Sequence, residues 1–388
     1  MHQAARTAER ILCDSFGERL ALQPEPLWDG HKSAVIRCRV RQPAPSSAPE
    51  SVIVKRAKIG TILADWAAAQ FLTAVPHDPP FAPCCYGGDL ASQTLVLEDL
   101  GPGDAPNTDA LLMSDDPAAA AMALIEHMHL IGQLHAATHG RAGDYMRIRR
   151  GLGPLPAPQQ LYHDPWPDAR VDPIAEEQRR QAVQAYQDRL RTVGLLTAGD
   201  VAGEIELVTT RVEAQPEAFL AFCQGDINLP GSCIRRGAHL RLYDFNCGGF
   251  RHALTEGLAG RLIWGCASRI PPEVLHEMDT AYRDALAAEY AAAQDNRLYM
   301  RALAEAAGRW HIFHMIGRLP TALERDYQRG PTSLRQQFLA WMEAFAAITE
   351  AAGHLTALGQ AARMLAGRLR GRWPAAVAAL PYYPAFRG

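Results

Sequence analysis

The sequence predicts an α+β protein with two lobes, a small strand-rich lobe in residues 1–98 and a larger, mainly helical lobe in residues 99–388. Alternating or β-branched apolar runs, which are typical of strands, are concentrated before residue 100. Alanine-rich segments with helical periodicity occupy most of the remaining chain, and the 388 residues can supply two lobes with ample core. We therefore expect an antiparallel sheet with one helix, a helical lobe, and a cleft between them.

The overall composition excludes several classes of partner. The chain carries 39 Lys and Arg against 42 Asp and Glu, a formal net charge of −3, so neither a nucleic acid nor an anionic membrane is an expected partner. Apolar residues make up 48% of the chain, which indicates a folded protein. The N-terminal residues lack a continuous apolar segment and no run of about 18 apolar residues occurs, so neither a secretory signal nor a spanning helix is expected. The scattered cysteines favour reduced thiols in the cytoplasm, and nothing indicates an oligomeric state.

The first expected elements are a helix and a strand with a turn before it. Residues 4–22 have an amphipathic pattern that predicts a helix. Residues 34–40 alternate apolar and polar side chains as a half-buried strand does, and a turn that contains Gly30 and Ser33 precedes them. The Pro- and Ser-rich residues 42–50 suit neither a helix nor a strand, so a solvated loop is expected there.

A second group of elements completes the first lobe. Residues 51–55 form a β-branched run that ends in Lys55 and predicts a strand. Residues 61–75 are expected to form the helix of this lobe, and the Pro- and Gly-rich residues 76–88 a loop. Residues 94–101 predict a strand with an acidic end that a glycine terminates.

The second lobe is predicted to be helical with one irregular excursion. Asp115, Asp116 and Pro117 mark the start of a long helix that runs to His139, because acidic residues and proline suit a helix N-terminus. The histidines of this helix lack a complete ligand set, so structural histidines are favoured over a metal site. Residues 140–173 are expected to be irregular. Further helices are predicted at 174–215 (two helices), 253–268, 271–293, 296–319, 334–353 and 355–372.

Residues 222–250 lie within this helical half and have a different pattern. They contain two acidic residues, Asp226 and Asp244, each at the end of a short apolar segment. Turns at Pro230-Gly231 and at Gly237 lie between them, which predicts a loop, two short paired strands and a second loop. That arrangement returns both carboxylates to the same end of the hairpin. Two such carboxylates suit phosphoryl transfer, in which one accepts the proton of an attacking hydroxyl and the other holds Mg²⁺ against the phosphates.

The same stretch resembles the aminoglycoside phosphotransferase and choline kinase group of the protein-kinase-like fold. Members carry H-G-D-x-x-x-x-N, a short strand and I-D-F/W-E/D, where this chain has Gln224-Gly225-Asp226 and Tyr243-Asp244-Phe245-Asn246. The resemblance covers approximately residues 25–270. It implies ATP or GTP and Mg²⁺ as cofactors and a small-molecule hydroxyl acceptor, with Asp226 as the catalytic base and Asp244 as a metal ligand. Gln224 replaces the family's histidine, which organises the loop.

The resemblance also implies nucleotide-binding residues in the first lobe. Lys55 matches the lysine that contacts the nucleotide phosphates, and Asp65 takes the place of the glutamate that holds it. Because aspartate is one methylene shorter than glutamate, a longer or water-bridged pair is expected. The glycine turn would cover the phosphates, and the backbone of residues 94–101, which resemble L-L-L-E-D-L-G, would receive the adenine. The cofactor-binding residues implied in this way are Lys55, Asp65, Gly30, Ser33, Glu98 and Leu100.

The chain departs from the family's pattern around the metal site. The family's asparagine, five residues after the base, falls on Gly231, or on Ser232 if the loop holds one extra residue. Asn228 is a third candidate, because its amide lies two residues from the base. Asn246 replaces an acidic residue. The implied metal ligands are Asp244, Asn228 and Ser232.

Two functions of different class fit these residues. The first is a nucleotide-dependent small-molecule kinase, supported by the retained lysine and two aspartates, because positioning and charge supply most of the catalysis in phosphoryl transfer. The second is a pseudokinase that uses the fold to bind a nucleotide, ligand or partner, supported by Gln224, Gly231 and Asn246. A hydrolase is disfavoured because the sequence lacks G-x-S-x-G, H-E-x-x-H and an uninterrupted Walker loop.

The acceptor is not identified by the sequence. Drug-modifying members often bind cationic acceptors in an acidic pocket, and Glu256, Asp279 and Asp284 are acidic residues of the second lobe. Solvated helix faces are the favoured interpretation for these three, since ionised side chains are seldom fully buried.

Overall fold

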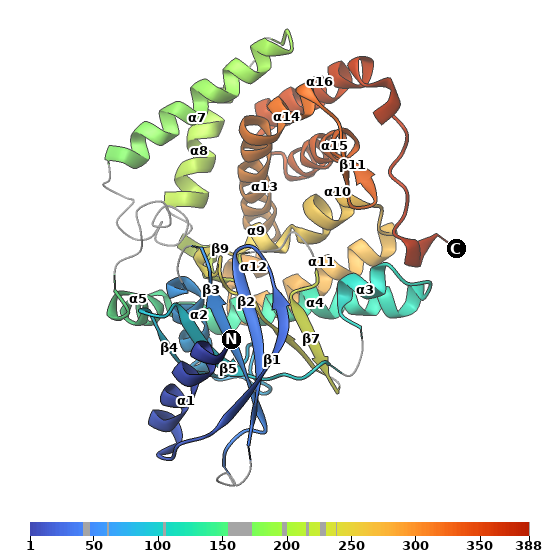
Figure 1. Cartoon of the computed structure of the whole chain (residues 1–388). Helices are drawn as coiled ribbons and strands as arrows, with labels where there is room; N and C mark the ends of the chain where they lie inside the picture. The colour runs from blue at the N-terminus through green and yellow to red at the C-terminus, as the bar shows by residue number, and fades with distance from the viewer. Residues whose placement is uncertain are drawn as a thin grey trace.

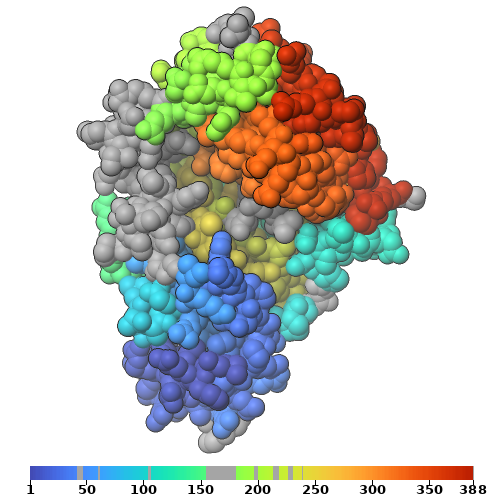
Figure 2. Space-filling view, turned by 45° about the horizontal axis from the view of Figure 1, so that its top comes forward, coloured from blue at the N-terminus to red at the C-terminus, as the bar shows by residue number. Residues whose placement is uncertain are grey.

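The computed structural model describes residues 1–41, 47–59, 62–103, 106–153, 173–195, 200–214, 217–225, 230–237 and 239–387. It is an α+β fold with two lobes, a sheet-rich N-terminal lobe and a larger helical lobe (Figure 1). The space-filling view shows a hollow between these lobes, with the yellow part of the chain recessed in it (Figure 2). None of the helices in the described ranges is both long enough and apolar enough to cross a membrane.

The N-terminal lobe is built on a five-stranded antiparallel sheet with the order β1-β2-β3-β5-β4. The strands are β1 (Leu22–Asp29), β2 (Ser33–Val40), β3 (Ser51–Ala57), β4 (Cys85–Asp89) and β5 (Thr94–Glu98). Alternate residues of β3, Val52 and Val54, are fully buried, as expected for β-branched side chains on one face of a sheet. Helix α1 (His2–Phe16) packs on the sheet and forms with it a small core of its own.

Helix α2 (Leu63–Thr73) links the sheet to the second lobe. Its Phe71 ring is fully buried and lies 5.4 Å from the ring of Phe222 and 5.6 Å from that of Phe250. These two phenylalanines begin and end the stretch that carries the predicted acidic residues. The helix therefore belongs to the large core, although it follows β3 in the chain.

The helical lobe is organised around α4 (Pro117–Thr138). The helix begins as predicted, because the Asp116 carboxylate accepts a hydrogen bond from the Ala119 N–H and Pro117 occupies the first turn. Helix α11 (Pro272–Ala287) packs along α4, and Gly132 permits the approach, since a Cβ there would lie 2.5 Å from the Tyr282 carbonyl oxygen. The other helical segments are α3 (Thr108–Leu112), α5 (Ala142–Gly151), α7 (Pro173–Thr192), α8 (Val201–Val208), η2 (Thr209–Ala214), η3 (Glu217–Phe219), α9 (Leu254–Gly257), η4 (Ala259–Trp264), α10 (Gly265–Ala267), α12 (Ala291–Gln294), α13 (Asn296–Phe313), η5 (His314–Arg318), α14 (Leu319–Glu324), α15 (Leu334–Ala352), α16 (Thr356–Arg372), η6 (Pro374–Ala376) and η7 (Pro384–Phe386).

Two small strand pairs lie where the lobes meet. Strands β7 (Cys233–Arg236) and β8 (His239–Leu242) form the antiparallel hairpin that the sequence predicts. Strands β6 (Leu220–Cys223) and β9 (Gly249–His252) pair outside it. A further pair, β10 (Gln328–Arg329) and β11 (Thr332–Ser333), lies in the helical lobe.

The start of the chain corrects one prediction. The first helix ends at Phe16 rather than at residue 22, because Gly17 takes a left-handed conformation with φ of 73° and caps it. The following residues form β1, which contains Pro24 and Pro26. An edge strand tolerates proline because one side of its backbone has no strand to bond.

Two predicted irregular segments contain regular structure. The predicted loop 76–88 ends in the first residues of β4, which begins at Cys85. The predicted irregular segment 140–173 begins with helix α5, and residues 154–172 lie outside the described part of the chain. In the predicted solvated loop 42–50, residues 42–46 likewise lie outside it.

Candidate active site

Lys55 is held between two carboxylates that come from different parts of the chain. Its Nζ lies 2.6 Å from Asp65 Oδ2 and 2.6 Å from Asp244 Oδ1. Lys55 is on β3, Asp65 is in the first turn of α2, and Asp244 follows β8. Burial alone would lower the pKa of Lys55, but the charges and hydrogen bonds of the two carboxylates raise it above its ordinary value. The lysine is therefore an ammonium ion at neutral pH.

The Lys55–Asp65 pair corrects an expectation, because the contact is direct rather than long or water-bridged. Helix α2 lies close enough to the sheet for the shorter aspartate to reach the lysine. Ala67 and Ala68 are fully buried, and a Cβ at Gly88 of β4 would lie 2.7 Å from the Trp66 ring. Small residues on both elements thus bring the helix close to the strands.

Asp244 is the exposed member of this cluster. Its side chain is 37% exposed, against 15% for Lys55 and 6% for Asp65. Its backbone has φ of 63°, a left-handed conformation that a residue with a Cβ seldom adopts. Such a conformation costs on the order of 1–3 kcal/mol and is concentrated at functional sites. Within the described part of the chain, Lys55 is the ion-pair partner of Asp244, and it contacts Oδ1.

Gln224 ties the ends of three strands together. The side chain is 1% exposed, and its Nε2 donates to the carbonyl oxygens of Tyr243 at 2.7 Å and Ser232 at 3.3 Å. Tyr243 directly precedes Asp244, so this amide fixes the backbone beside that aspartate. Gly225 follows with φ of 91°, and a Cβ there would lie 1.9 Å from the Cys247 carbonyl oxygen, which explains the glycine.

The buried carboxylate of Glu256 binds the backbone of the same segment. Glu256 is 2% exposed, and it accepts hydrogen bonds from the N–H groups of Gly225 at 2.6 Å and Gln224 at 3.2 Å. The imidazole of His135 contacts Glu256 Oε2 through Nε2 at 3.0 Å and the Tyr282 hydroxyl through Nδ1 at 2.9 Å. Burial would raise the pKa of Glu256, but His135 and the Gly225 N–H lower it below its ordinary value.

This network corrects the interpretation of Glu256 as part of a solvated helix face, and it agrees with a structural role for His135. Together with Cys223, these two residues form a buried cluster whose potential ligand atoms lie within 4.8 Å of one another. Both nitrogens of His135 and both oxygens of Glu256 are already hydrogen-bonded, so the cluster is explained without a metal ion.

The remaining residues of the predicted central site fall into two groups. Asp226 and Asn228 lie outside the described residues, and Gly225 is the last described residue before them. Ser232 is next to Asp244 across the strand ends, because its carbonyl oxygen accepts from the Tyr243 N–H at 3.1 Å. The structure therefore pairs the backbone of Ser232 with that of Tyr243, the residue before the predicted metal ligand Asp244.

The glycine turn lies at the end of the strand that neighbours Lys55. The Gly30 N–H donates to the Ser33 carbonyl oxygen at 3.0 Å, which closes the turn between β1 and β2. Val35 is opposite Lys55 in the sheet, two residues beyond Ser33. A Cβ at Gly30 would lie 2.0 Å from the exposed Trp28 ring, so a larger residue there would require that ring to shift.

The hinge, which we define as residues 98–100 at the end of β5, is held at Glu98 by contacts that the sequence does not reveal. The Glu98 carboxylate accepts two hydrogen bonds from Arg241 and one from the Cys84 N–H, so both of its oxygens are bonded to groups of the protein itself. Leu100 is 4% exposed. Any contact of this segment with a base would therefore come from its backbone.

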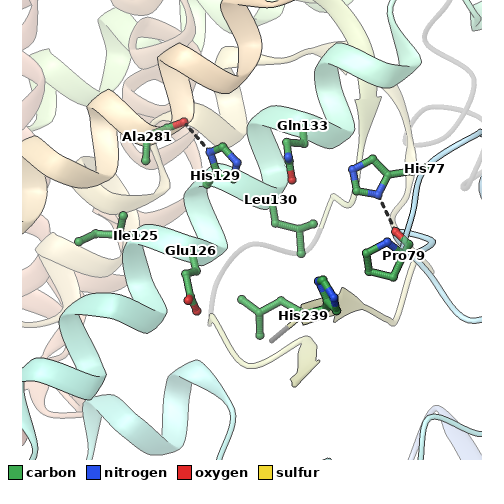
Figure 3. A pocket seen from close by; sticks show the side chains of 10 residues that line it. His77, Pro79, Ile125, Glu126, His129, Leu130, Gln133, His239 and Ala281 are labelled. Atoms are coloured by element: carbon green, nitrogen blue, oxygen red, sulfur yellow. Dashed lines mark hydrogen bonds between the residues drawn. The ribbon is translucent and has the colours of Figure 1, made fainter. Parts of the chain in front are cut away.

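Two cavities lie outside this cluster. One, of about 320 Å³, lies between α4, β8 and the segment after α2, and His77, His129 and His239 are among its lining residues (Figure 3). The other, of about 580 Å³, lies among η4, α11, α13 and α15. Neither is lined by Lys55, Asp65 or Asp244, whereas Asp279 is among the residues that line the second.

No protein-family model and no curated protein matches the sequence. Among solved structures, the chain is similar to a choline kinase from Cryptosporidium parvum Iowa II, with 10% identity, a TM-score of 0.43, and coverage of 92% of this chain and 91% of that chain. It is similar to the aminoglycoside phosphotransferase APH(2'')-IIa in a ternary complex with streptomycin and ATP, with 12% identity, a TM-score of 0.45, and coverage of 83% and 96%. It is also similar to a choline/ethanolamine kinase family protein from Mesorhizobium loti, with 14% identity, a TM-score of 0.41, and coverage of 93% of this chain and 99% of that chain.

Proposed function

We propose that this protein is a phosphotransferase that moves the terminal phosphoryl group of ATP or GTP to a hydroxyl of a small molecule. The observation that supports this most is the ammonium of Lys55 on β3, which lies between Asp65 of α2 and Asp244, the residue two positions after β8. A fixed cation and an open carboxylate are what phosphoryl transfer requires, because the protein contributes mainly positioning and charge.

Lys55 would contact the nucleotide phosphates, and Asp65 would hold it in place. Asp244 would bind Mg²⁺, with Ser232 or Asn228 as a further ligand. The donor chemistry fits, since Mg²⁺ takes oxygen ligands, commonly one or two carboxylates with phosphate oxygens and water, and the Asp244 carboxylate is 37% exposed. When bound, the ion would neutralise charge on the transferred phosphoryl group.

Asp226 would accept the proton of the acceptor hydroxyl. It directly follows Gly225, whose N–H is fixed by Glu256, and Gln224 would organise the loop through its amide. A base that follows a fixed backbone segment would need little reorganisation during the reaction, which favours rapid transfer.

The remaining assignments concern the nucleotide and the lobes. The backbone near Glu98 and Leu100 would receive the base, and the turn from Gly30 to Ser33 would cover the phosphates. The boundary between the lobes would fall between residues 98 and 99, with an N-lobe of 1–98 and a C-lobe of 99–388. The acceptor would be a small molecule with a free hydroxyl, such as a sugar or an amino alcohol.

A pseudokinase is the second candidate, because Gly231 and Asn246 replace residues that the resembling family uses at its metal site. Magnesium dependence separates the two. For the enzyme we expect ATP or GTP with Mg²⁺ to raise the free energy of unfolding, by about 2.7 kcal/mol at a nucleotide concentration of about 100 times Kd. In Asp244→Ala the gain from Mg²⁺ should vanish. Thermal-shift titrations with and without Mg²⁺ measure this, and tight nucleotide binding that ignores the metal in the wild type would favour the pseudokinase.

Asp226→Ala tests the base. Turnover in a screen of hydroxyl acceptors should fall by roughly 10² to 10⁴, while the nucleotide Kd stays near the wild-type value. Asp14→Ala, at an exposed aspartate of α1, serves as the control and should leave both quantities unchanged. Full turnover in Asp226→Ala would exclude the proposed role.

A further inference from the structure

An ion pair between Glu98, at the end of β5, and Arg241 of β8 joins the two lobes. Arg241 lies in β8, flanked by Leu240 and Leu242, and is 8% exposed. Its Nη1 donates to Glu98 Oε1 at 2.8 Å and its Nη2 to Glu98 Oε2 at 2.7 Å. This bidentate geometry is the strong form of an arginine–carboxylate pair. It connects residues that are 143 positions apart in the chain.

The same two side chains hold the segment that leads into β4. Arg241 Nη2 also donates to the Ala82 carbonyl oxygen, and the Cys84 N–H donates to Glu98 Oε2 at 2.9 Å. The backbone of β8 adds a bond from the Leu242 N–H to the Phe81 carbonyl oxygen at 2.7 Å. The cavity in Figure 3 borders this junction, since His239 of β8 and Pro79 both line it.

Two strands connect the Glu98–Arg241 pair to the candidate site. Strand β5, which ends in Glu98, is paired with β3 so that Leu95 lies opposite Lys55. Strand β8 carries Arg241 and ends at Leu242, and Asp244, whose carboxylate contacts Lys55, follows two residues later. The distance between Lys55 and Asp244 is thus set by two strands whose ends are fastened together.

We infer that Arg241 is a positioning residue, which fixes Asp244 relative to Lys55 by binding β8 to the hinge through Glu98. This inference rests on the proposed phosphotransferase function. Burial would raise the pKa of Glu98, but its hydrogen bonds with Arg241 and Cys84 lower it, so the carboxylate is charged at neutral pH and the pair is ionic.

The test compares Arg241→Met and Arg241→Lys with the wild type. We expect Arg241→Met to lower kcat by roughly tenfold to 100-fold, because small misplacements of reacting groups have effects of this size. The gain in nucleotide affinity from Mg²⁺ should fall as well, while the affinity without Mg²⁺ changes little. Arg241→Lys should lie between, since lysine keeps the charge and loses the bidentate geometry. Glu98→Gln should resemble Arg241→Met, and the double variant should be no worse than either.

Arg261→Met is the control, because Arg261 forms a two-bonded pair with Asp279 that lies wholly within the helical lobe. It should leave kcat and the Mg²⁺ effect unchanged. A lower melting temperature in Arg241→Met with an unchanged Mg²⁺ effect and kcat would show a purely structural role and overturn the inference. A wild type that binds no nucleotide under any condition would overturn the proposed function itself, and the inference with it.

Discussion

Lys55→Met is expected to lower kcat/KM for phosphotransfer by on the order of 10² to 10³. Removal of one preorganised donor from a transition-state charge has an effect of this size. Two further changes act in the same direction. Asp65, 6% exposed, loses its cation, and the repulsion between Asp65 and Asp244 is no longer compensated. The measurement is nucleotide consumption in the presence of an acceptor, at saturating Mg²⁺.

The matched control is Arg56→Met. Arg56 is the next residue on β3 and is exposed, and its side chain leaves the strand on the opposite face of the sheet from Lys55. It should retain wild-type kcat/KM. Equal loss in both variants would indicate damage to β3 rather than to the site, and wild-type activity in Lys55→Met would refute the role of Lys55.

The parts of the fold that depend on local pattern were predictable. The β-branched run around Val52 and Val54 predicts β3, and the acidic residues before Pro117 predict the start of α4, because each signal comes from neighbouring residues. The meeting of Lys55 with Asp65 and Asp244 was predicted through the family resemblance, since no periodicity connects residues 189 positions apart.

The buried ionic supports of the site could not be predicted in the same way. Glu256 and Arg241 have partners that are far from them in the chain. The residue type alone does not distinguish a buried charged side chain from an exposed one. A signal was present in each case. Glu256 is the one acid in an otherwise apolar and glycine-rich stretch, and Arg241 lies between Leu240 and Leu242 at the end of a strand. A charge in such surroundings indicates a specific partner.

Strand β1, at the edge of the sheet, could not be predicted for a different reason. Pro24 and Pro26 indicate a break in regular structure when the sequence is taken alone, because proline donates no hydrogen bond. The sheet accepts them since β1 has a neighbour on one side only. Whether a strand is at an edge depends on the order of all five strands, which no local pattern contains.

Glu256→Ala is expected to lower the free energy of unfolding by roughly 3–5 kcal/mol, because removal of one member of a buried charged network leaves its partners without compensation. His135 and the N–H groups of Gln224 and Gly225 would each lose an acceptor. Glu256→Gln keeps the volume and one acceptor oxygen, so its loss should be smaller, about 1–3 kcal/mol. Urea unfolding monitored by circular dichroism measures both.

The pH dependence separates the charge of Glu256 from its shape. The pKa of Glu256 is lowered in the folded protein, so its ionisation stabilises the fold above its unfolded pKa of about 4.3. That stability is lost as the pH falls through the lower folded pKa. Glu256→Gln should therefore flatten the acid limb of the stability profile, while the difference from wild type shrinks at low pH.

Glu305→Gln is the control for this experiment. Glu305 is 5% exposed on α13, it is bound by Arg301 and His354, and these hydrogen bonds likewise lower its pKa against the effect of burial. Both variants should lose stability in the same acid range. Only Glu256→Gln should also lower phosphotransfer at neutral pH and at temperatures where the protein is fully folded, because only Glu256 holds the backbone beside Asp226. Equal activity in the two variants would mean that Glu256 stabilises the fold without positioning the loop.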